Sequence, residues 1–378
     1  MMQKENKVLI VLGTIVQGGA HRVALMQANE LSEMGYEVTL LSIVKPNKEY
    51  FALSRKVQHK YLFPQEDVEN SGIKSKIYRR SMVFIKLPLY MKKNRPDIVI
   101  SHIQGTNREA IISSFFNGIP IIACEHTSHH LPKGLKGSIA TFERRFIYKL
   151  ASKITVLTEY DRNTFYSKYI DHVEVMRNPC PFPISLNKDQ VVRDKTILAV
   201  GDLNRINIKG WDTLLKVAKR VKENGIVDWK FKIAGGGAEG FDILTRMITE
   251  NNLDDIVELL GPISDIKNLY KTSSVFILTS RNEGLPMSLI EAMSQGCASI
   301  AFDCITGPSD IIDNNVNGIL VENQNIDMMV NGVISLIKDS KLRSDFSEKS
   351  ISDSKIFSLE SVMNDWDFII QDTLKRHG

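Results

Sequence analysis

Cysteines and long apolar runs are scarce in this sequence, and each shortage excludes a class of protein. The four cysteines among 378 residues show no CxxC spacing and no nearby histidine pair, so neither a zinc site nor a disulfide framework is predicted. A reducing, intracellular setting fits this pattern best. The longest apolar stretch near the start, residues 8–16, is too short for a membrane-spanning helix of roughly 20 residues. We favour a buried first strand there over a cleaved signal peptide, because Gly18-Gly19 and a helical pattern follow.

The composition is that of a globular protein large enough for more than one core. Hydrophobic residues make up 43% of the chain and charged residues 24%, which excludes a disordered or fibrous protein. The length allows two or three domains of roughly 100 to 200 residues each. The net charge of +4 argues for neither nucleic-acid binding nor an acidic tail. It is unevenly divided, since residues 1–185 carry a net charge of +10 and residues 186–378 a net charge of −6.

Short runs rich in Val, Ile and Leu alternate with amphipathic stretches along the whole chain. Continuous apolar strands separated by helices predict parallel sheets that are covered on both faces. In the first half, strands are expected at residues 7–13, 36–44, 97–101, 119–124, 154–157 and 173–176, with a helix at 20–34. After a proline-dense break, strands are expected at 196–200, 229–234, 257–260, 275–278, 298–302 and 318–321.

These patterns predict an α/β fold of two Rossmann-like, doubly wound domains that face a cleft. The break at residues 178–183 is the best linker in the sequence, so we expect a first domain over 1–183 and a second over 184–357. Apolar residues at helical spacing after residue 358 predict a packed closing helix rather than a loose tail. A ligand is expected at the carboxyl ends of the strands.

The strongest chemical signal is a strand-to-helix segment at residues 280–291. Gly284 allows the backbone to bend and Pro286 fits the first turn of a helix, so free N–H groups at the helix start are expected to form an anion site. Glu283 in the turn is placed to bind sugar hydroxyls, and Glu291 in the helix is placed to bind those of a ribose. The alternative is an ordinary turn with two solvated carboxylates.

A basic loop opens the second half, directly after the strand expected at 196–200. Arg205 and Lys209 stand four positions apart just before a helix, where they are placed to neutralise a phosphate or diphosphate. The alternative is a solvated basic pair. The turn after the first strand lacks a G-x-G-x-x-G fingerprint, which argues against a dehydrogenase.

A histidine follows the strand expected at residues 119–124. His126 comes after Glu125 at the carboxyl end of this strand, where an α/β domain presents residues to ligands. It is a candidate to hydrogen-bond a sugar or an acceptor, and the alternative is a histidine that packs against the strand end. His129 and His130 follow without a third residue at metal-ligand spacing, so no metal site is expected.

Residues 71–96 contain eight basic side chains and no acidic one, interleaved with apolar residues at helical spacing. A basic amphipathic helix of this kind lies on an anionic membrane surface or holds a diphosphate head group. The candidate contacts are Arg79, Arg80, Lys92 and Lys93. An ordinary domain helix with a solvated basic face is the alternative.

In their order along the chain, these motifs resemble those of the retaining GT-B glycosyltransferases of family four. The resemblance spans nearly the whole chain, and the pair Glu283 and Glu291 is its most specific element. It implies transfer of a sugar from a nucleotide diphosphate sugar, with retained anomeric configuration and without metal or cofactor. It also implies an N-terminal acceptor domain (1–183), a C-terminal nucleotide-sugar domain (184–357) and a closing helix (358–378) that crosses back to the first domain.

Carried over residue by residue, the resemblance implies a division of roles. His126 and Glu283 are the expected catalytic residues, Glu291 is expected at the ribose, and Arg205 with Lys209 at the diphosphate. The implied donor contacts are Gly19, Arg205, Lys209, Ile263, Glu283, Gly284, Leu285, Pro286, Met287 and Glu291. Fixed cations and helix N–H groups then stabilise the negative charge of the leaving nucleoside diphosphate.

The segment 304–310 resembles a form of the family found in bacterial polysaccharide and lipid-linked oligosaccharide assembly. It implies a UDP-hexose or UDP-N-acetylhexosamine donor and a glycan or undecaprenyl-diphosphate-linked acceptor. It also implies a cytoplasmic protein on the inner membrane face, with no nucleic-acid partner. Asp202 replaces an arginine usual in the family and His21 replaces a glutamate, which leaves two alternatives open. These are a catalytically weakened nucleotide-sugar-binding protein of the same fold and a sugar-nucleotide epimerase.

Overall fold

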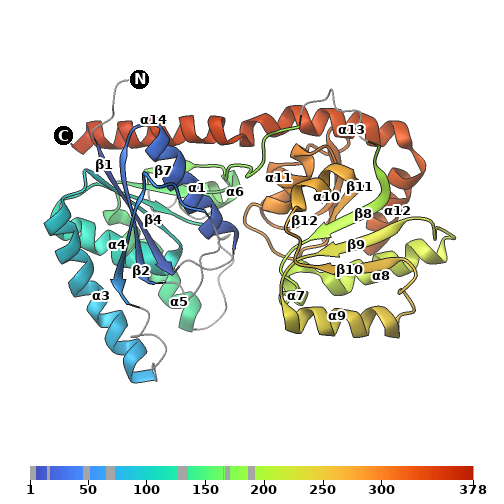
Figure 1. Cartoon of the computed structure of the whole chain (residues 1–378), viewed down its shortest axis with the longest axis horizontal. Helices are drawn as coiled ribbons and strands as arrows, with labels where there is room; N and C mark the ends of the chain where they lie inside the picture. The colour runs from blue at the N-terminus through green and yellow to red at the C-terminus, as the bar shows by residue number, and fades with distance from the viewer. Residues whose placement is uncertain are drawn as a thin grey trace. The chain divides into compact units, whose positions relative to one another are not determined.

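The chain folds into two compact units, each a parallel sheet covered by helices (Figure 1). The computed structural model describes residues 6–14, 18–45, 52–64, 73–126, 135–164, 166, 171–185 and 192–377. Unit 1 comprises Met1–Pro179 and Val362–Gly378, and unit 2 comprises Cys180–Ser361. The predicted α/β class with two Rossmann-like domains is confirmed.

Unit 1 contains a seven-stranded parallel sheet in the order β3-β2-β1-β4-β5-β6-β7. Its strands are β1 (Lys7–Thr14), β2 (Glu37–Val44), β3 (Gln58–Phe63), β4 (Ile98–His102), β5 (Ile121–Cys124), β6 (Lys153–Val156) and β7 (Val173–Val175). Its helical segments are α1 (Gly19–Glu33), α3 (Ile73–Asn94), α4 (Gln104–Asn117), α5 (Leu135–Phe142), η1 (Glu143–Ile147), η2 (Tyr148–Leu150) and α6 (Glu159–Thr164).

Unit 2 contains a six-stranded parallel sheet in the order β10-β9-β8-β11-β12-β13. Its strands are β8 (Asp194–Val200), β9 (Lys230–Ala234), β10 (Val257–Gly261), β11 (Ser273–Leu278), β12 (Ala298–Asp303) and β13 (Gly318–Glu322). Its helical segments are α7 (Ile206–Lys209), α8 (Trp211–Glu223), α9 (Ala238–Glu250), α10 (Ile266–Thr272), α11 (Met287–Ser294), η4 (Pro308–Asp310), α12 (Ile326–Lys338), α13 (Ser340–Asp353) and η5 (Ser354–Phe357).

Strand order determines where each sheet can bind a ligand. In unit 1, β1 pairs with β2 on one side and with β4 on the other, and in unit 2, β8 lies in the same way between β9 and β11. Connections leave these central strands in opposite directions, and open α/β sheets bind ligands at the carboxyl ends of the strands beside such a reversal. The segments that follow β1, β4, β8 and β11 are therefore the first places to look for function.

The central strands are buried on both faces, which explains why they were recognised in the sequence. Val8 to Leu12 of β1 are at most 2% exposed, as expected for a strand covered by helices on both sides. The edge strand β3 differs, since most of its residues are exposed or only partly buried. Its first three residues, Gln58 to Lys60, are polar, and the sequence analysis did not predict this strand.

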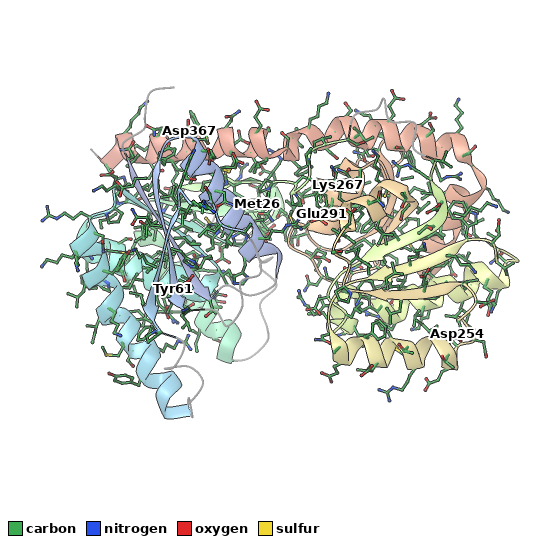
Figure 2. The ribbon with its side chains drawn as sticks, viewed as in Figure 1. Met26, Tyr61, Asp254, Lys267, Glu291 and Asp367 are labelled. Atoms are coloured by element: carbon green, nitrogen blue, oxygen red, sulfur yellow. The ribbon has the colours of Figure 1, made fainter. Side chains whose placement is uncertain are left out.

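The closing helix α14 (Leu359–His377) returns the chain from unit 2 to unit 1. It buries Trp366 and Ile370, and it carries Asp367 (Figure 2). The hydroxyl of Tyr36 donates to Asp367 over 2.5 Å, and the ammonium of Lys153 lies 2.9 Å from Asp372. These contacts confirm the expectation that the closing helix crosses back to the first domain.

In the part of the chain that the structure describes, no helix is long and apolar enough to cross a bilayer. All four cysteines are buried and form no disulfide bond.

The packing of α14 predicts a difference between two neighbouring substitutions. Ile370→Ala removes a fully buried side chain and is expected to lower the free energy of unfolding by about 2–5 kcal/mol. Phe368→Ala removes a side chain that is 76% exposed on the same helix and is expected to change it by about 0.5 kcal/mol or less. Urea unfolding followed by circular dichroism measures both, and equal losses would contradict the packing described here.

Candidate functional site

Two loops meet at the strand reversal of unit 2. We call residues 201–210 the β8 loop and residues 279–287 the β11 loop, since each follows the strand of that number. Gly210 has φ +67°, and a Cβ atom there would lie 2.0 Å from the carbonyl oxygen of Thr279. Only glycine permits this approach. The backbone N–H of Arg281 donates to the carbonyl of Ile208 over 2.8 Å. The two loops are therefore held together through their backbones.

A cation and a carboxylate face each other across these loops. The ammonium of Lys209 lies 2.7 Å from Oε1 of Glu283, and these side chains are 14% and 11% exposed. The hydroxyl of Ser280 donates to the same oxygen over 2.6 Å. Two residues from separate sequence predictions are thus brought into direct contact, and a nearly buried ion pair occupies the carboxyl ends of β8 and β11.

A second ion pair, between Arg281 and Asp212, links the β11 loop to the start of α8. The guanidinium of Arg281 donates to both carboxylate oxygens of Asp212 over 2.7 Å, and also to the carbonyl oxygen of Asn207 over 2.8 Å. Bidentate arginine–carboxylate pairs fix orientation as well as distance. The hydrogen bond from Arg281 lowers the pKa of Asp212. Arg281 therefore orients the β8 loop that carries Lys209.

A third segment supports Glu283 from its other side. The hydroxyl of Thr306 donates to the carbonyl oxygen of Glu283 over 2.6 Å. Gly307 has φ +97°, and a Cβ atom there would lie 2.5 Å from the carbonyl oxygen of Gly284. These two contacts give a physical reason for a threonine at position 306 and a glycine at position 307.

Helix α11 begins one residue later than the sequence suggested. Pro286 is the cap residue rather than a member of the first turn, with φ −70° and ψ 102°, and its carbonyl accepts from Leu289 and Ile290. The N–H groups of Met287 and Ser288 precede these first intrahelical bonds and lie at the positive end of the helix dipole. Leu285 is buried beside them. The expected anion site keeps its backbone donors.

The second glutamate of the motif is buried in α11. Glu291 is 6% exposed (Figure 2), and the hydroxyl of Tyr270 on α10 donates to its Oε2 over 3.0 Å. No local sequence pattern marks Tyr270, because its partner is 21 positions away on another element.

The remaining predicted donor contacts are Arg205 in the β8 loop, Ile263 after β10 and Gly19 in unit 1. Arg205 is exposed, and no described residue pairs with its side chain; its carbonyl accepts from Lys209 N over 2.9 Å. Asp202 is used within the β8 loop, where its carboxylate accepts from the N–H of Asn204. Ile263 follows β10 and is 37% exposed. Gly19 belongs to unit 1, where it opens α1.

A histidine pair lies at the strand reversal of unit 1. Nδ1 of His102, the last residue of β4, is 2.8 Å from Nε2 of His126, which follows β5 by two residues. Nε2 of His102 lies 2.9 Å from Oε1 of Gln27 on α1. Burial lowers the pKa of His126 to about 4 and holds that of His102 well below its ordinary value. Both rings are therefore neutral at pH 7.

The carboxylate of Glu125 is bound by neighbouring buried side chains. Its carboxylate accepts from the guanidinium of Arg144 over 2.6 Å and from the hydroxyl of Tyr148. All three side chains are at most 3% exposed. The carboxylate raises the pKa of Tyr148 further than burial alone. This cluster anchors the backbone from which His126 projects.

Comparison with known proteins follows the same division of the chain. The model described as Glycosyltransferase Family 4 matches residues 17–181, and the one described as Glycosyl transferases group 1 matches residues 186–353. The amylovoran biosynthesis glycosyltransferase AmsD of Erwinia amylovora is 31% identical over 96% of this chain and 99% of its own length. The chain belongs to the family-4 glycosyltransferases.

Another relative and a solved structure extend this likeness. A Campylobacter jejuni α-1,4-N-acetyl-D-galactosaminyltransferase, named for GalNAc-alpha-(1->4)-GalNAc-alpha-(1->3)-diNAcBac-PP-undecaprenol, is 25% identical over 95% of this chain and 97% of its own length. The Anabaena protein Alr3699/HepE, solved in complex with UDP and glucose, superposes with a TM-score of 0.76 at 15% identity, covering 97% of this chain and 100% of that one. The two Rossmann-like units and the returning helix of this glycosyltransferase are the GT-B fold.

The basic segment of the glycosyltransferase forms α3, as predicted. Arg80, Lys92 and Lys93 are exposed, whereas the side chain of Arg79 lies outside those that the structure describes. Tyr78, Ile85 and Leu89 are 67%, 53% and 60% exposed. Their spacing of seven and four residues puts them on one side of the helix. Exposed apolar and basic side chains thus share α3.

Within the described residues, no group of three or more His, Cys, Asp or Glu side chains is arranged to hold a metal ion. The sequence analysis missed His102, which contacts His126, and Gln27, which contacts His102. His102 carried a usable signal, because it ends an apolar strand just as His126 follows one. Gln27 carried none.

The pair between Asp212 and Arg281 predicts a pH-dependent loss of stability. The folded-state pKa of Asp212 is lowered, so its contribution is complete above the unfolded pKa of about 3.9 and is lost as the pH falls through the lower folded value. Asp212→Asn is therefore expected to lower the melting temperature at pH 7 and to have a shrinking effect below pH about 4. Asp242→Asn, at an exposed carboxylate, is the control. A difference between wild type and Asp212→Asn that stays constant down to the lowest accessible pH would contradict this assignment.

Proposed function

We propose that this glycosyltransferase transfers a hexose or N-acetylhexosamine from a UDP-linked donor to a lipid-linked or polysaccharide acceptor, with retention of configuration. The contact between Lys209 and Glu283 at the strand reversal of unit 2 carries the proposal. It joins a cation suited to a diphosphate and a carboxylate suited to sugar hydroxyls in one place. The complex of Alr3699/HepE with UDP and glucose supports a UDP-linked donor, and the Campylobacter relative supports a polyprenyl-diphosphate-linked acceptor.

The leaving group sets the main requirement of the reaction. The bond between the anomeric carbon and the diphosphate oxygen breaks, and the electron pair leaves with the nucleoside diphosphate. Lys209, Arg205 and the N–H groups at the start of α11 are the groups that stabilise this negative charge. Preorganised donors of this kind are the largest contribution to many enzymatic rates. In the proposal these groups replace a metal ion.

The two glutamates bind hydroxyl groups at opposite ends of the donor. Glu283 is held at Oε1 by Lys209 and Ser280, and it accepts hydrogen bonds from hydroxyls of the transferred sugar. Glu291, oriented by Tyr270, binds the ribose. His126 of unit 1 accepts a hydrogen bond from a hydroxyl of a substrate sugar. The acceptor oxygen bonds to the anomeric carbon on the face that the diphosphate leaves, and its proton passes to the departing diphosphate.

Loss of the Lys209 cation tests this assignment. Lys209→Ala is expected to lower kcat/KM for sugar transfer by about 100-fold or more, the range for removal of one transition-state donor. Lys219→Ala, at an exposed lysine on α8, is the matched control and is expected to leave transfer unchanged. The assay follows UDP release and a labelled sugar, with the donor first chosen by the increase in melting temperature that each nucleotide sugar produces.

Two outcomes overturn the proposal in different ways. Equal activity of Lys209→Ala and wild type would remove Lys209 from the site. Tight binding of a nucleotide sugar without transfer to any member of a broad acceptor panel would leave the protein a binding protein of the same fold. A proton NMR spectrum of the product reports the anomeric configuration and decides between retention and inversion.

Independence of metal is expected from the same charges. Dialysis against EDTA is expected to leave the transfer rate within about twofold of its starting value, because the fixed cations and α11 dipole of the proposed site act without an ion. Rates measured with and without added Mg²⁺ or Mn²⁺ after dialysis check this. Loss of activity that a divalent ion restores would contradict it.

We further propose that α3 is the surface through which the enzyme reaches an anionic membrane. The exposed Tyr78, Ile85 and Leu89 supply apolar area for the boundary of the acyl chains, and Lys92 with Lys93 supply positive charge. Each lysine near an anionic surface contributes about 1 kcal/mol. The net charge of +10 over residues 1–185 acts in the same direction.

A charge-reversal pair tests the membrane surface. The double variant Lys92→Glu and Lys93→Glu is expected to lower binding to vesicles with anionic lipid by about tenfold or more at low salt. Lys338→Glu with Lys341→Glu, two exposed lysines of unit 2, is the matched control. Sedimentation with the vesicles measures both, and the same binding by the two double variants would contradict the assignment.

A further inference from the structure

The three side chains Gln27, His102 and His126 form a continuous hydrogen-bonded row in unit 1. Oε1 of Gln27 lies 2.9 Å from Nε2 of His102, and Nδ1 of His102 lies 2.8 Å from Nε2 of His126. Gln27 is 1% exposed and His102 is completely buried. The two imidazole rings are stacked, with centroids 5.1 Å apart and planes 26° from parallel. A buried row of this kind has a definite direction, because each neutral imidazole has one donor and one acceptor nitrogen.

The direction follows from the amide oxygen of Gln27. A carbonyl oxygen accepts, so Nε2 of His102 carries the proton that it donates to Gln27. The buried ring of His102 is neutral, so its Nδ1 is the acceptor, and Nε2 of His126 must donate to it. His126 is neutral as well, and its single proton is therefore on Nε2. Nδ1 of His126 is left with a free lone pair.

That lone pair is the end of the row, and nothing in the described chain uses it. Nδ1 of His126 is buried and has no hydrogen-bond partner among the described residues. A buried polar atom without a partner costs free energy and calls for an explanation. As an acceptor, Nδ1 of His126 pairs with a donor, and a sugar hydroxyl is a donor that the family-4 reaction supplies.

The backbone beside His102 is strained. Ile103, the next residue, has φ +74° and ψ 132°. A β-branched residue at positive φ is a true outlier that costs about 1–3 kcal/mol, and such residues cluster at functional sites. Its carbonyl accepts from Asn107 N and its N–H donates to the carbonyl of Cys124, so the strained turn is fixed at both ends. The position of the His102 ring is set by this turn.

Burial is the main reason that both rings are neutral. His21, in the first turn of α1, would disfavour their protonation further whenever it carried a charge. Burial lowers the pKa of His21 itself. A positive charge is also disfavoured at the N-terminus of a helix. A carboxylate at this position would instead favour the charged forms of the neighbouring imidazoles.

We propose that Gln27 and His102 are positioning residues, which hold His126 in the tautomer with a proton on Nε2 and so make its Nδ1 an acceptor for a hydroxyl of the substrate sugar. The proposal rests on the proposed function for the identity of this hydroxyl. The tautomer itself is independent of it. Gln27 and His102 contact no substrate and act through His126 alone.

The first experiment reads the tautomer directly. In wild-type protein labelled with ¹⁵N-histidine, long-range proton–nitrogen NMR at pH 7.5 is expected to show Nε2 of His126 protonated and Nδ1 unprotonated, with the signal assigned by comparison with His126→Gln. A proton on Nδ1 of His126 overturns the proposal. This measurement needs no activity. If the wild-type chain transfers no sugar, the proposed function fails while the tautomer is still decided.

The second experiment uses variants that keep or remove the acceptor. Asn at position 102 brings its amide oxygen to the place of Nδ1, so His102→Asn is expected to keep the tautomer and a kcat within a few-fold of wild type. His102→Leu is expected to lower kcat by about tenfold or more, the effect of one lost hydrogen bond. Both are compared by circular dichroism, and the KM for the donor is expected to change less than kcat.

Gln27 supplies a matched pair of its own. Gln27→Leu removes the acceptor, whereas Gln27→Glu replaces it with a carboxylate, which favours the protonated form of His102. A protonated His102 donates from Nδ1, so in the glutamate variant the proton of His126 is expected to move from Nε2 to Nδ1, with a lower kcat. The leucine variant is expected to give a mixture of both tautomers of His126, also with a lower kcat. Equal kcat and equal spectra for Gln27→Leu and wild type would overturn the assignment of Gln27. A loss in both glutamine variants with an unchanged His126 spectrum would reduce its role to packing.

Discussion

The contact between Lys209 and Glu283 is the interaction on which the strand reversal of unit 2, and the donor site proposed there, depend. Each residue belongs to a loop that leaves a central strand of unit 2, and strand order brings the two loops to the same edge of the sheet. The side chains of Lys209 and Glu283 are only 14% and 11% exposed, so solvent and salt screen their attraction weakly. Without ligand, each charge neutralises the other. In the proposed function, Lys209 binds the diphosphate and Glu283 binds a hydroxyl of the transferred sugar.

Most of the surrounding structure serves to hold this pair in place. Arg281 binds Asp212 bidentately and the backbone of the β8 loop, Thr306 supports the carbonyl of Glu283, and glycines allow backbones to touch where any side chain would collide. None of these groups is needed for chemistry by itself. They supply preorganisation, since charges fixed before the reaction need not reorganise during it.

The strand reversal of unit 1 differs from that of unit 2 in the charge of the side chains around it. Among the described residues, the strand reversal of unit 1 presents a row of neutral histidines beside the buried ion pair of Glu125 and Arg144. In the proposed function, unit 2 binds the charge of a nucleoside diphosphate, and unit 1 makes directional hydrogen bonds to hydroxyl groups. The asymmetry of charge between the two halves of the sequence, +10 against −6, is a separate property, carried by exposed surfaces such as α3.

Sequence reasoning predicted what local pattern controls and missed what distant contacts control. The buried strands are continuous apolar runs, so twelve of them were predicted. Strand β3 was missed because it lies at an edge and its first three residues are polar. Lys209 and Glu283 were both predicted, but their direct contact spans 74 positions and has no local signature. Asp212, Tyr270 and Gln27 were missed for the same reason. The placement of Pro286 outside α11 depended on a one-residue shift that the motif does not encode.

Hydrogen–deuterium exchange locates the bound donor without assuming a role for any residue. A stabilising UDP-sugar is expected to slow exchange of the backbone amides in residues 201–211 and 279–291, with the N–H groups at the start of α11 among the most protected. In Lys209→Ala this protection is expected to weaken at the same nucleotide-sugar concentration. Unchanged exchange in both segments, with protection elsewhere in the chain, would contradict the account.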